Sequence, residues 1–269
     1  MSRFRGFVAV AGLCAVALVG GACSRSGGAT VQGVKLVKKG HLITCTHLPY
    51  PPFQSTQGEK VVGFDVDMID LVAKKLGVTQ KVVDTSFETI KGGAALNAGK
   101  CDVAAAGMTI KPERAKFLDF SRPYFDATQA LMASKDSGIT SLDDVKTRKL
   151  KIGSQGSTTG EDYVRSKGFN PLSFDNSSAE LDGLRTGQVG VIVQDYPVVQ
   201  GWLKDPANAK FAVVANLHTG EQYGFAVKKR GNPKLLKMIN QAIAQAEQDG
   251  TYKRIYEKWI GPCNDCVPG

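Results

Sequence analysis

The sequence predicts an α/β protein that consists of two units of similar size. The chain has 269 residues, whereas a typical single domain has ~100–150. Short apolar segments with strand character alternate with segments whose apolar residues recur at helical spacing, and 30 glycines and 11 prolines provide many short turns. Hydrophobic residues make up 42% and charged residues 22% of the chain, which argues against a disordered, fibrous or coiled-coil protein.

Residues 1–22 are predicted to be a secretory signal peptide. Two arginines precede an apolar run from Phe7 to Val19, and small residues follow it. The run is shorter than the ~20 residues that a membrane-spanning helix needs, and no later stretch reaches that length. The small residues directly before Cys23 resemble a bacterial lipobox, so Cys23 is expected to carry a lipid; ordinary cleavage near Ala22 is the alternative.

Residues 23–34 are predicted to form a flexible tether, because the segment after Cys23 is rich in glycine and serine. The protein is therefore expected outside the cytoplasm, attached to the cell membrane only by its lipid, either in a periplasm or at the outer face of the cytoplasmic membrane. The net charge is +9, but lysine and arginine are dispersed along the chain. This distribution argues against a nucleic-acid partner.

Four of the six cysteines belong to the body of the exported protein, where disulfides persist. Cys263 and Cys266 lie in a tail punctuated by proline and glycine, and a small terminal disulfide is expected there. A redox pair normally opens a helix beside a βαβ unit, whereas this pair follows the last helix. Cys45 and Cys101 are too isolated to complete a zinc site and are expected to be buried or paired, with the pairing left open.

The first unit is predicted to follow a βαβαβ order. Its strands cover residues 41–46, 81–83 and 102–106, and its helices cover residues 65–76 and 87–98. Asp65 is available as the N-cap of the first helix and Gly77 ends it, while Gly92 and Gly93 weaken the second helix. Because βαβ connections are right-handed, this order predicts a parallel sheet.

The second unit begins after Ser134 and has a similar pattern without detectable sequence repetition. Its predicted elements, in order, are strand 149–154, helix 161–167, strand 172–174, helix 179–186 and strand 189–194, which ends at Asp195. Two terminal helices follow, and their apolar stripes are expected to be core. The stripes consist of Leu236, Ile239, Ile243 and Ala246, and of Tyr252, Ile255, Tyr256 and Trp259.

Several kinds of chemistry find no support in the sequence. Residues 153–157 do not fit the Gly-x-Ser-x-Gly turn of a hydrolase, and the loop that follows lacks the Gly-Lys-Ser/Thr ending of a P-loop. None of the three histidines has metal-ligand spacing with another. Asp65, Asp67 and Asp70 begin a helix and lack the later Gly and Glu of a calcium loop. We therefore expect no metal, no cofactor and no covalent catalysis.

Three loops with binding chemistry lie at the carboxyl ends of predicted strands, where open α/β sheets place ligands. Residues 50–53 present aromatic rings held by prolines, residues 107–114 combine backbone groups with a hydroxyl and a guanidinium, and residues 155–160 lead into a helix N-terminus. The N–H groups of that terminus favour an anion. Asp195 offers the opposite charge, so these groups together are complementary to a zwitterion.

Six motifs occur in the order typical of one bacterial family. They are Gly63-Phe64-Asp65-Val66-Asp67, Gly107-Met108-Thr109-Ile110 with Glu113-Arg114, Asp119-Phe120-Ser121-Arg122-Pro123-Tyr124, Gln155-Gly156-Ser157-Thr158, Gln194-Asp195-Tyr196-Pro197 and Gln222-Tyr223-Gly224. Each motif is weak alone, but their order and spacing are specific. Over residues 35–261, the chain resembles family 3 bacterial extracellular solute-binding proteins.

The resemblance implies a two-lobed, periplasmic-binding-protein-like fold of type II, in which each lobe is a mostly parallel sheet with flanking helices. Residues 35–125 and 224–269 would form the first lobe and residues 129–220 the second, with hinge strands near residues 124–128 and 221–225. Such a protein is a monomer that binds an L-amino acid without catalysis. It delivers the amino acid to the permease of an ABC importer.

The resemblance also implies a role for each candidate ligand-binding residue. Arg114 would pair with the α-carboxylate of the ligand, helped by the Thr109 hydroxyl and the Thr158 backbone. Asp195 and the Gly107 carbonyl would hold the α-ammonium group. The remaining candidates are Tyr50 and Phe87, which would sandwich the ligand side chain, and Met108, Gln155 and His47.

Some of these residues have simpler structural interpretations. Arg114 would then form a surface ion pair with Glu113 or Asp119, and Phe87 would be a core residue. His47 is expected to face the ligand side chain. Many members of the family have Asp or another small polar residue at this position, in contact with the ligand, so the ligand class cannot be copied from them. The alternative for His47 is a strand-end histidine hydrogen-bonded to backbone.

An enzyme on the same fold is the alternative function. A few relatives with this fold are cyclohexadienyl dehydratases, which act on arogenate or prephenate. Such an enzyme needs a carboxylic acid in its cleft to protonate the leaving hydroxyl. Asp195 is available for that role, but a partnership with an ammonium group explains it better.

Overall fold

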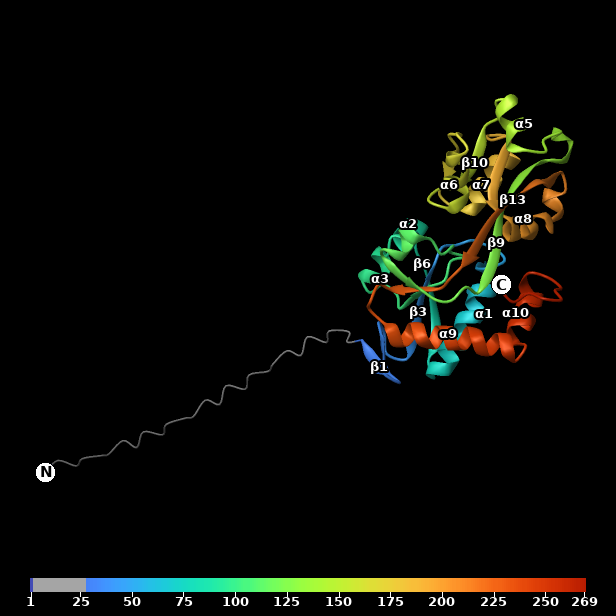
Figure 1. The fold of residues 1–269 in the computed structure, drawn as a ribbon. Helices are drawn as coiled ribbons and strands as arrows, with labels where there is room; N and C mark the ends of the chain where they lie inside the picture. The colour runs from blue at the N-terminus through green and yellow to red at the C-terminus, as the bar shows by residue number, and fades with distance from the viewer. Residues whose placement is uncertain (2–27) are drawn as a thin grey trace.

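Two five-stranded sheets, each with helices packed against it, form two lobes that are joined by two long strands (Figure 1). This computed structural model describes Met1 and residues 28–269. The rest of the predicted signal peptide and the predicted lipid site at Cys23 lie outside the described residues. The predicted α/β class and the two-lobed architecture are confirmed.

The first lobe is built on a sheet with the strand order β6-β3-β7-β14-β8. Its strands are β3 (His41–Thr46), β6 (Thr79–Asp84), β7 (Val103–Ala104), β8 (Leu118–Phe120) and β14 (Ala226–Lys228). Because β3 runs parallel to both β6 and β7, the predicted βαβαβ arrangement is confirmed. One face of the sheet packs on α1 (Phe64–Leu76), α9 (Pro233–Gln248) and α10 (Thr251–Trp259), and the other packs on α2 (Phe87–Lys91) and α3 (Ala94–Asn97).

The second lobe is built on a sheet with the strand order β11-β10-β12-β9-β13. Its strands are β9 (Phe125–Ser134), β10 (Ile152–Gln155), β11 (Leu172–Phe174), β12 (Val191–Asp195) and β13 (Phe211–Tyr223). Its helices are α5 (Leu142–Thr147), α6 (Thr159–Ser166), α7 (Ser177–Arg185) and α8 (Tyr196–Leu203), with short 3₁₀ turns over Lys135–Ser137 and Pro206–Asn208. β10 is parallel to β11 and β12, whereas β9 is antiparallel to β12 and β13.

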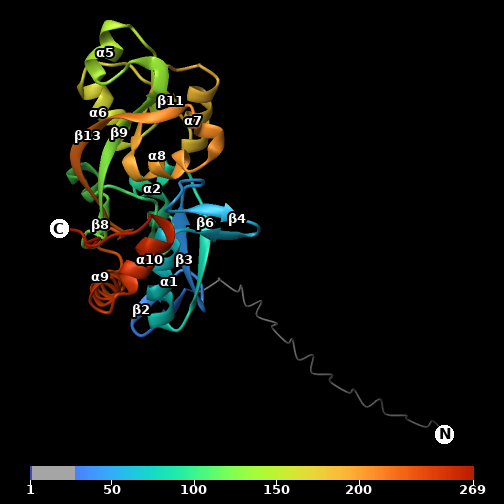
Figure 2. The same cartoon turned by 90° about the vertical axis from the view of Figure 1, so that its right-hand side faces the viewer.

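The strands β9 and β13 connect the lobes (Figure 1 and Figure 2). They pair from Phe211 with Ser134, in the second lobe, to Tyr223 with Phe125, next to the first lobe. The register shifts twice, and the second shift lies between Leu217 and Glu221. Such an irregularity turns the following side chains relative to a regular ladder.

Asp65 is not the N-cap of α1, in contrast to the sequence-based expectation. Gly63 occupies the cap position, and no side chain caps this helix. The Asp65 carboxylate is instead turned inward and is fully buried. At the other end, Gly77 ends the helix with a φ of 71°, as predicted, because glycine readily adopts this left-handed conformation.

The helix predicted over residues 87–98 is broken into α2 and α3 at Gly93. Gly93 has a φ of 75°, which is incompatible with a continuous right-handed helix. The apolar stripe predicted for α9 is confirmed at Ile239, Ile243 and Ala246, but Leu235 takes the place of Leu236. Leu235 is fully buried, whereas Leu236 is half-buried and packs at the edge of the core.

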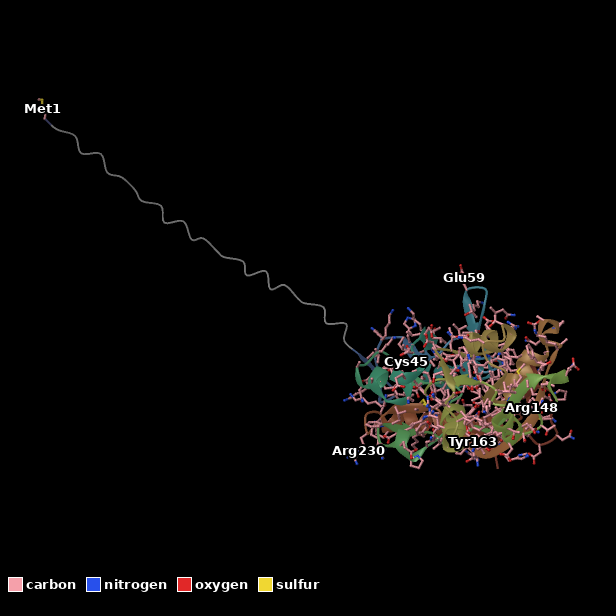
Figure 3. All side chains as sticks on the ribbon, turned by 90° about the horizontal axis from the view of Figure 1, so that it is seen from above. Met1, Cys45, Glu59, Arg148, Tyr163 and Arg230 are labelled. Carbon is pink, nitrogen blue, oxygen red and sulfur yellow. A yellow bond between two sulfur atoms is a disulfide. The ribbon has the colours of Figure 1, made fainter. Side chains whose placement is uncertain are left out.

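Two short hairpins extend the first lobe. In the first, β1 (Ala29–Val31) pairs with β2 (Val34–Leu36). In the second, β4 (Ser55–Gln57) pairs with β5 (Lys60–Val62), and the turn between these strands projects from the lobe with Glu59 at its tip (Figure 3). The first hairpin overlaps the segment 23–34 that was predicted to be a flexible tether. It is ordered because the buried side chains of Val34 and Leu36 pack on the core. Among the described residues, no helix is long and apolar enough to cross a membrane.

The structure contains two disulfides. The predicted terminal disulfide joins Cys263 and Cys266. Cys45, near the end of β3, is joined to Cys101, just before β7, with their Cα atoms 5.6 Å apart. The sequence had left this second pairing open, and the side-by-side position of the two strands explains it.

Candidate functional site

A cavity of about 20 Å³ lies between the two lobes. It is lined by His47, Tyr50, Gln54, Phe87, Ala106, Gly107, Thr109, Arg114, Gln155, Thr158, Thr159 and Asp195. All the ligand-binding residues predicted from the sequence are in this set except Met108. The side chain of Met108 is fully buried in the core of the first lobe, next to Phe87 and Leu118 in the same cluster.

The cavity forms where the strands of both sheets end. In the first lobe, the chain reaches His47 and Tyr50 after β3, and it reaches Gly107 and Thr109 after β7. From the second lobe come Gln155 at the end of β10, Thr158 and Thr159 at the start of α6, and Asp195 at the end of β12. This arrangement follows the rule that open α/β sheets bind ligands at the carboxyl ends of their parallel strands.

Gly107 shapes one wall of the cavity and requires glycine. Its φ is 52°, and a Cβ atom at this position would lie 2.9 Å from Cε1 of Tyr50. The inward-turned Asp65 fixes this loop, since its carboxylate accepts hydrogen bonds from the Gly107 N–H (2.8 Å) and the Tyr124 hydroxyl (2.7 Å). Burial raises the pKa of Asp65 to about 7. A carboxyl group beneath the cavity thus holds the loop in place.

Arg114 brings a buried positive charge to the cavity. Its side chain donates a hydrogen bond to the Thr109 carbonyl (2.9 Å), and its guanidinium carbon lies 5.3 Å from the centre of the Phe87 ring. Burial lowers the pKa of Arg114. Within the described part of the chain, Arg114 forms no salt bridge, and Asp119 pairs with Lys229 (2.9 Å) instead. Unused N–H groups of a buried guanidinium can bind an anion such as a carboxylate.

Asp195 brings a buried negative charge from the opposite lobe. The Tyr50 hydroxyl lies 2.5 Å from its Oδ2 atom, and the Tyr223 hydroxyl and the Gln129 amide also donate hydrogen bonds to it. Burial, followed by the negative charge of Glu221, raises the pKa of Asp195 to about 6. Asp195 forms no salt bridge with any residue that the structure describes. The cavity therefore has a cation on one lobe and a carboxyl group on the other.

Tyr50 lines the cavity and contacts the opposite lobe. Its hydroxyl reaches across from the first lobe to Asp195 and lies 2.9 Å from Oε1 of Gln194. A cavity of about 20 Å³ has room for one water molecule but not for an amino acid. Ligand entry therefore requires the lobes to separate or Tyr50 to rotate away from Asp195.

His47 lines the cavity and also bridges the lobes. Its Nδ1 atom is 3.1 Å from the Thr85 carbonyl oxygen, and its Nε2 atom is 3.1 Å from the Asp175 carbonyl oxygen. Both partners are acceptors, so both ring nitrogens must donate if both contacts are to be hydrogen bonds. This geometry is close to the alternative considered above, a histidine engaged by backbone groups, although the ring still borders the cavity.

Four polar residues near the cavity were missed by the sequence analysis, as was Ala106 in its wall. Gln54 and Thr159 line it, while Gln129 and Glu221 lie directly behind Asp195. Thr159 follows the predicted Thr158, so proximity in sequence could have indicated it. Gln129 and Glu221 carry no local signal, because only the pairing of β9 with β13 brings them together.

The acidic residues at the start of α1 are engaged in protein contacts. Asp65 holds the Gly107 loop, and Asp67 accepts hydrogen bonds from Lys258 and Trp259, both at 2.7 Å. Among residues 28–269, no group of three or more His, Cys, Asp and Glu side chains is arranged to hold a metal ion.

Two α/β lobes, with a buried arginine on one and a buried aspartate on the other facing a shared cavity, define the class of two-lobed solute-binding proteins. Residues 42–262 match the bacterial extracellular solute-binding proteins, family 3. The chain belongs to this family, as the sequence motifs had indicated.

Two relatives that align with most of this chain are named as amino-acid-binding proteins. The L-cystine-binding protein TcyJ of Escherichia coli (strain K12) is 33% identical over 94% of this chain and 95% of its own length. The arginine-binding extracellular protein ArtP of Bacillus subtilis (strain 168) is 29% identical over 89% of this chain and 91% of its own length.

Solved structures show the same fold. An ancestral arginine-binding protein bound to arginine has a TM-score of 0.76 and 41% identity, covering 83% of this chain and 99% of that one. The ancestral amino acid-binding protein AncCDT-1, a precursor of cyclohexadienyl dehydratase, has a TM-score of 0.75 and 33% identity, covering 82% of this chain and 96% of that one.

Proposed function

We propose that the protein binds one L-amino acid outside the cytoplasm and delivers it to the permease of an ABC importer. The observation that carries this proposal is the pair Arg114 and Asp195, two buried opposite charges on opposite lobes of one cavity. They match the α-carboxylate and the α-ammonium group of an amino acid. The family and the amino-acid-binding relatives support the proposal.

The remaining contacts follow from this orientation of the ligand. We assign the Thr109 hydroxyl and the Thr158 backbone to the carboxylate, beside Arg114, and the Gly107 carbonyl to the ammonium group, since all three residues line the cavity. We assign the side-chain end of the ligand to the region of Tyr50 and Phe87. Gln155, a buried cavity residue whose Oε1 atom has no partner in the described structure, offers an acceptor to the ligand.

Binding in this proposal involves opening and closing of the lobes. The lobes consist of residues 35–125 with 224–269 and of residues 129–220, and β9 and β13 act as hinges near residues 124–128 and 221–225. The polar contacts between the lobes include the ion pair of Lys111 with Asp162 (2.7 Å) and the hydrogen bond from the Ser177 hydroxyl to the Pro49 carbonyl (2.7 Å). Such contacts can be exchanged when a hinge moves.

Thermal shift measurements test the proposed function. We expect one of L-arginine, L-cystine, L-glutamine or L-histidine, the amino acids named for the relatives, to raise the melting temperature. A ligand at 100 times its Kd stabilises the folded state by about 2.7 kcal/mol, which amounts to several degrees. Native mass spectrometry of the purified protein identifies any retained amino acid. If neither these nor the other standard amino acids bind, the proposal is wrong.

A dehydratase activity is the second candidate, favoured by one observation. The pKa of Asp195, raised to about 6, leaves part of this cleft carboxyl group protonated near neutral pH, as a general acid would be. We propose that the protein is not an enzyme, because Asp195 is better matched to an ammonium group. Incubation with arogenate or prephenate should therefore give no aromatic product, and turnover that is lost in Asp195→Asn would establish the enzyme instead.

We also propose that Cys23 carries a lipid that anchors the protein to the membrane. The support is the apolar run and the small residues that precede this cysteine. The wild type is expected in the membrane fraction, and Cys23→Ala is expected in the soluble extracytoplasmic fraction. A wild-type N-terminus without acyl mass would contradict the anchor without affecting the proposed ligand.

A further inference from the structure

Glu221 links the two lobes from the hinge strand β13. Its Oε2 atom accepts hydrogen bonds from the Thr109 hydroxyl (2.8 Å) of the first lobe and the Thr159 hydroxyl (2.7 Å) of the second. Its Oε1 atom accepts a hydrogen bond from the Gln129 amide (3.1 Å). Because Thr109 and Thr159 also line the ligand cavity, the Glu221 carboxylate lies directly behind the cavity wall.

Glu221 and Asp195 share one hydrogen-bond donor. The Gln129 side-chain nitrogen donates to Asp195 and to Glu221, so its two hydrogens connect two carboxyl groups. Neither carboxyl group forms a salt bridge within the part of the chain that the structure describes. The carboxylates of Asp195 and Glu221 together attract a cation more strongly than one alone. They repel each other when no cation is bound.

We propose that Glu221 is a specificity-determining residue that makes the site select a charged ammonium group: its carboxylate, joined to Asp195 through Gln129, adds a second negative charge behind the ammonium position. This inference rests on the proposed binding of an amino acid. Glu221 acts as a positioning residue, since it reaches the ligand through Asp195, Gln129 and Thr109. A ligand with a neutral group in place of the ammonium gains nothing from this second charge.

The raised pKa of Asp195 makes ligand binding depend on pH. The titratable and charged groups that face Asp195 are Tyr50, Tyr223, Glu180, Glu221 and Arg114. Because the pKa of Asp195 is raised to about 6, Asp195 takes up a proton in the ligand-free protein as the pH falls through this value. The ammonium group must displace that proton, so binding weakens as the pH falls from about 7.5 to about 5.

The test is calorimetric titration of wild type and Glu221→Gln between pH 5 and 8, with whichever of L-arginine, L-cystine, L-glutamine and L-histidine binds the wild type. We expect Glu221→Gln to weaken binding about 10-fold at pH 7.5. The loss should shrink toward pH 5, because without the Glu221 charge Asp195 protonates at lower pH. The L-2-hydroxy acid with the same side chain should bind both proteins equally within about twofold.

Asp162→Asn is the matched control. It also removes one negative charge near Arg114 and one contact between the lobes, the ion pair with Lys111, but it does not touch Asp195. Its pH profile should match that of the wild type. An equal loss for Glu221→Gln at every pH, or an equal loss for the hydroxy acid, would reduce Glu221 to a purely structural residue.

A second measurement keeps the inference testable if Glu221→Gln folds poorly. Thr159→Val removes one of the two hydroxyls that hold Glu221 and keeps the shape of the side chain. Titration of the wild type and Thr159→Val at pH 5.5 in buffers of different ionisation enthalpy counts the protons released on binding. We expect fewer protons from Thr159→Val than from the wild type, because a Glu221 carboxylate held by one hydroxyl fewer raises the pKa of Asp195 less. Equal proton release from the two proteins would overturn the inference. If no amino acid binds the wild type, the proposed function fails first.

Discussion

Removing either buried charge of the cavity should weaken amino-acid binding by about 30-fold to several thousandfold, or ~2–5 kcal/mol. The suitable variants are Arg114→Met and Asp195→Asn, which retain much of the side-chain volume. Each leaves one charged end of the ligand buried without its partner, which is the costly part of the change. Isothermal titration calorimetry measures the loss directly.

The stability of the ligand-free protein distinguishes this effect from damage to the fold. Arg114 is buried and forms no salt bridge with any residue among the described ones, and burial lowers its pKa, so its charge destabilises the fold until an anion binds. Arg114→Met should therefore melt at a temperature equal to or above that of the wild type, while the shift caused by the ligand disappears. A mutation that merely disrupted packing would lower the melting temperature of the ligand-free protein as well as the shift caused by the ligand.

Arg122→Ala is the control for Arg114. Arg122 is exposed and pairs with the partly buried carboxylate of Glu247 (3.1 Å), away from the cavity. The affinity of the Arg122→Ala variant for the amino acid should stay within about twofold of the wild-type affinity. If the losses for Arg114→Met and Asp195→Asn were below about threefold, neither residue would hold the ligand.

The double variant Cys45→Ala/Cys101→Ala should lose about 4 kcal/mol of unfolding free energy. The disulfide closes a loop with a sequence separation of 56, and the loss of that constraint on the unfolded chain gives this magnitude. Both sulfurs are buried, so small cavities add to the loss. Urea denaturation should show a lower midpoint and a steeper dependence on urea, since the unfolded chain exposes more surface without the cross-link.

The terminal disulfide provides the matched control. Cys263 and Cys266 are separated by only 3 positions in a tail beyond the last helix. The same loop relation gives less than about 2 kcal/mol for so short a loop, and Cys263→Ala/Cys266→Ala should lose no more than that. If the Cys45→Ala/Cys101→Ala variant lost less than about 1 kcal/mol, or if free thiols were found at both positions in the unfolded wild type, the cross-link would not exist in the native protein.

Features encoded within a few neighbouring residues were correctly predicted from the sequence. The strand His41–Thr46 and the end of α1 at Gly77 depend on local patterning and on one left-handed glycine. The Cys263–Cys266 disulfide depends on two cysteines close in sequence. The loops with binding chemistry could be named because strand ends are visible as boundaries in the sequence, and the family motifs then assigned a role to each residue.

Features that depend on strand order were decided only by the tertiary structure. Cys45 meets Cys101 because β7 lies beside β3. Asp65 has a sequence position suited to capping a helix, but it is turned inward because Gly107 and Tyr124 supply donors from distant segments.

The surroundings of Asp195 combine a feature that the local sequence predicts with one that depends on the tertiary structure. The sequence identifies Asp195 as the end of a strand, and thus as a candidate for the cation of a ligand. It does not reveal Glu221, because the hydrogen bonds that join Glu221 to Gln129, Thr109 and Thr159 connect residues that are 92, 112 and 62 positions away. Local patterns determine which residues form strands and helices, whereas contacts between distant residues arise only when the sheets assemble and the two lobes face each other.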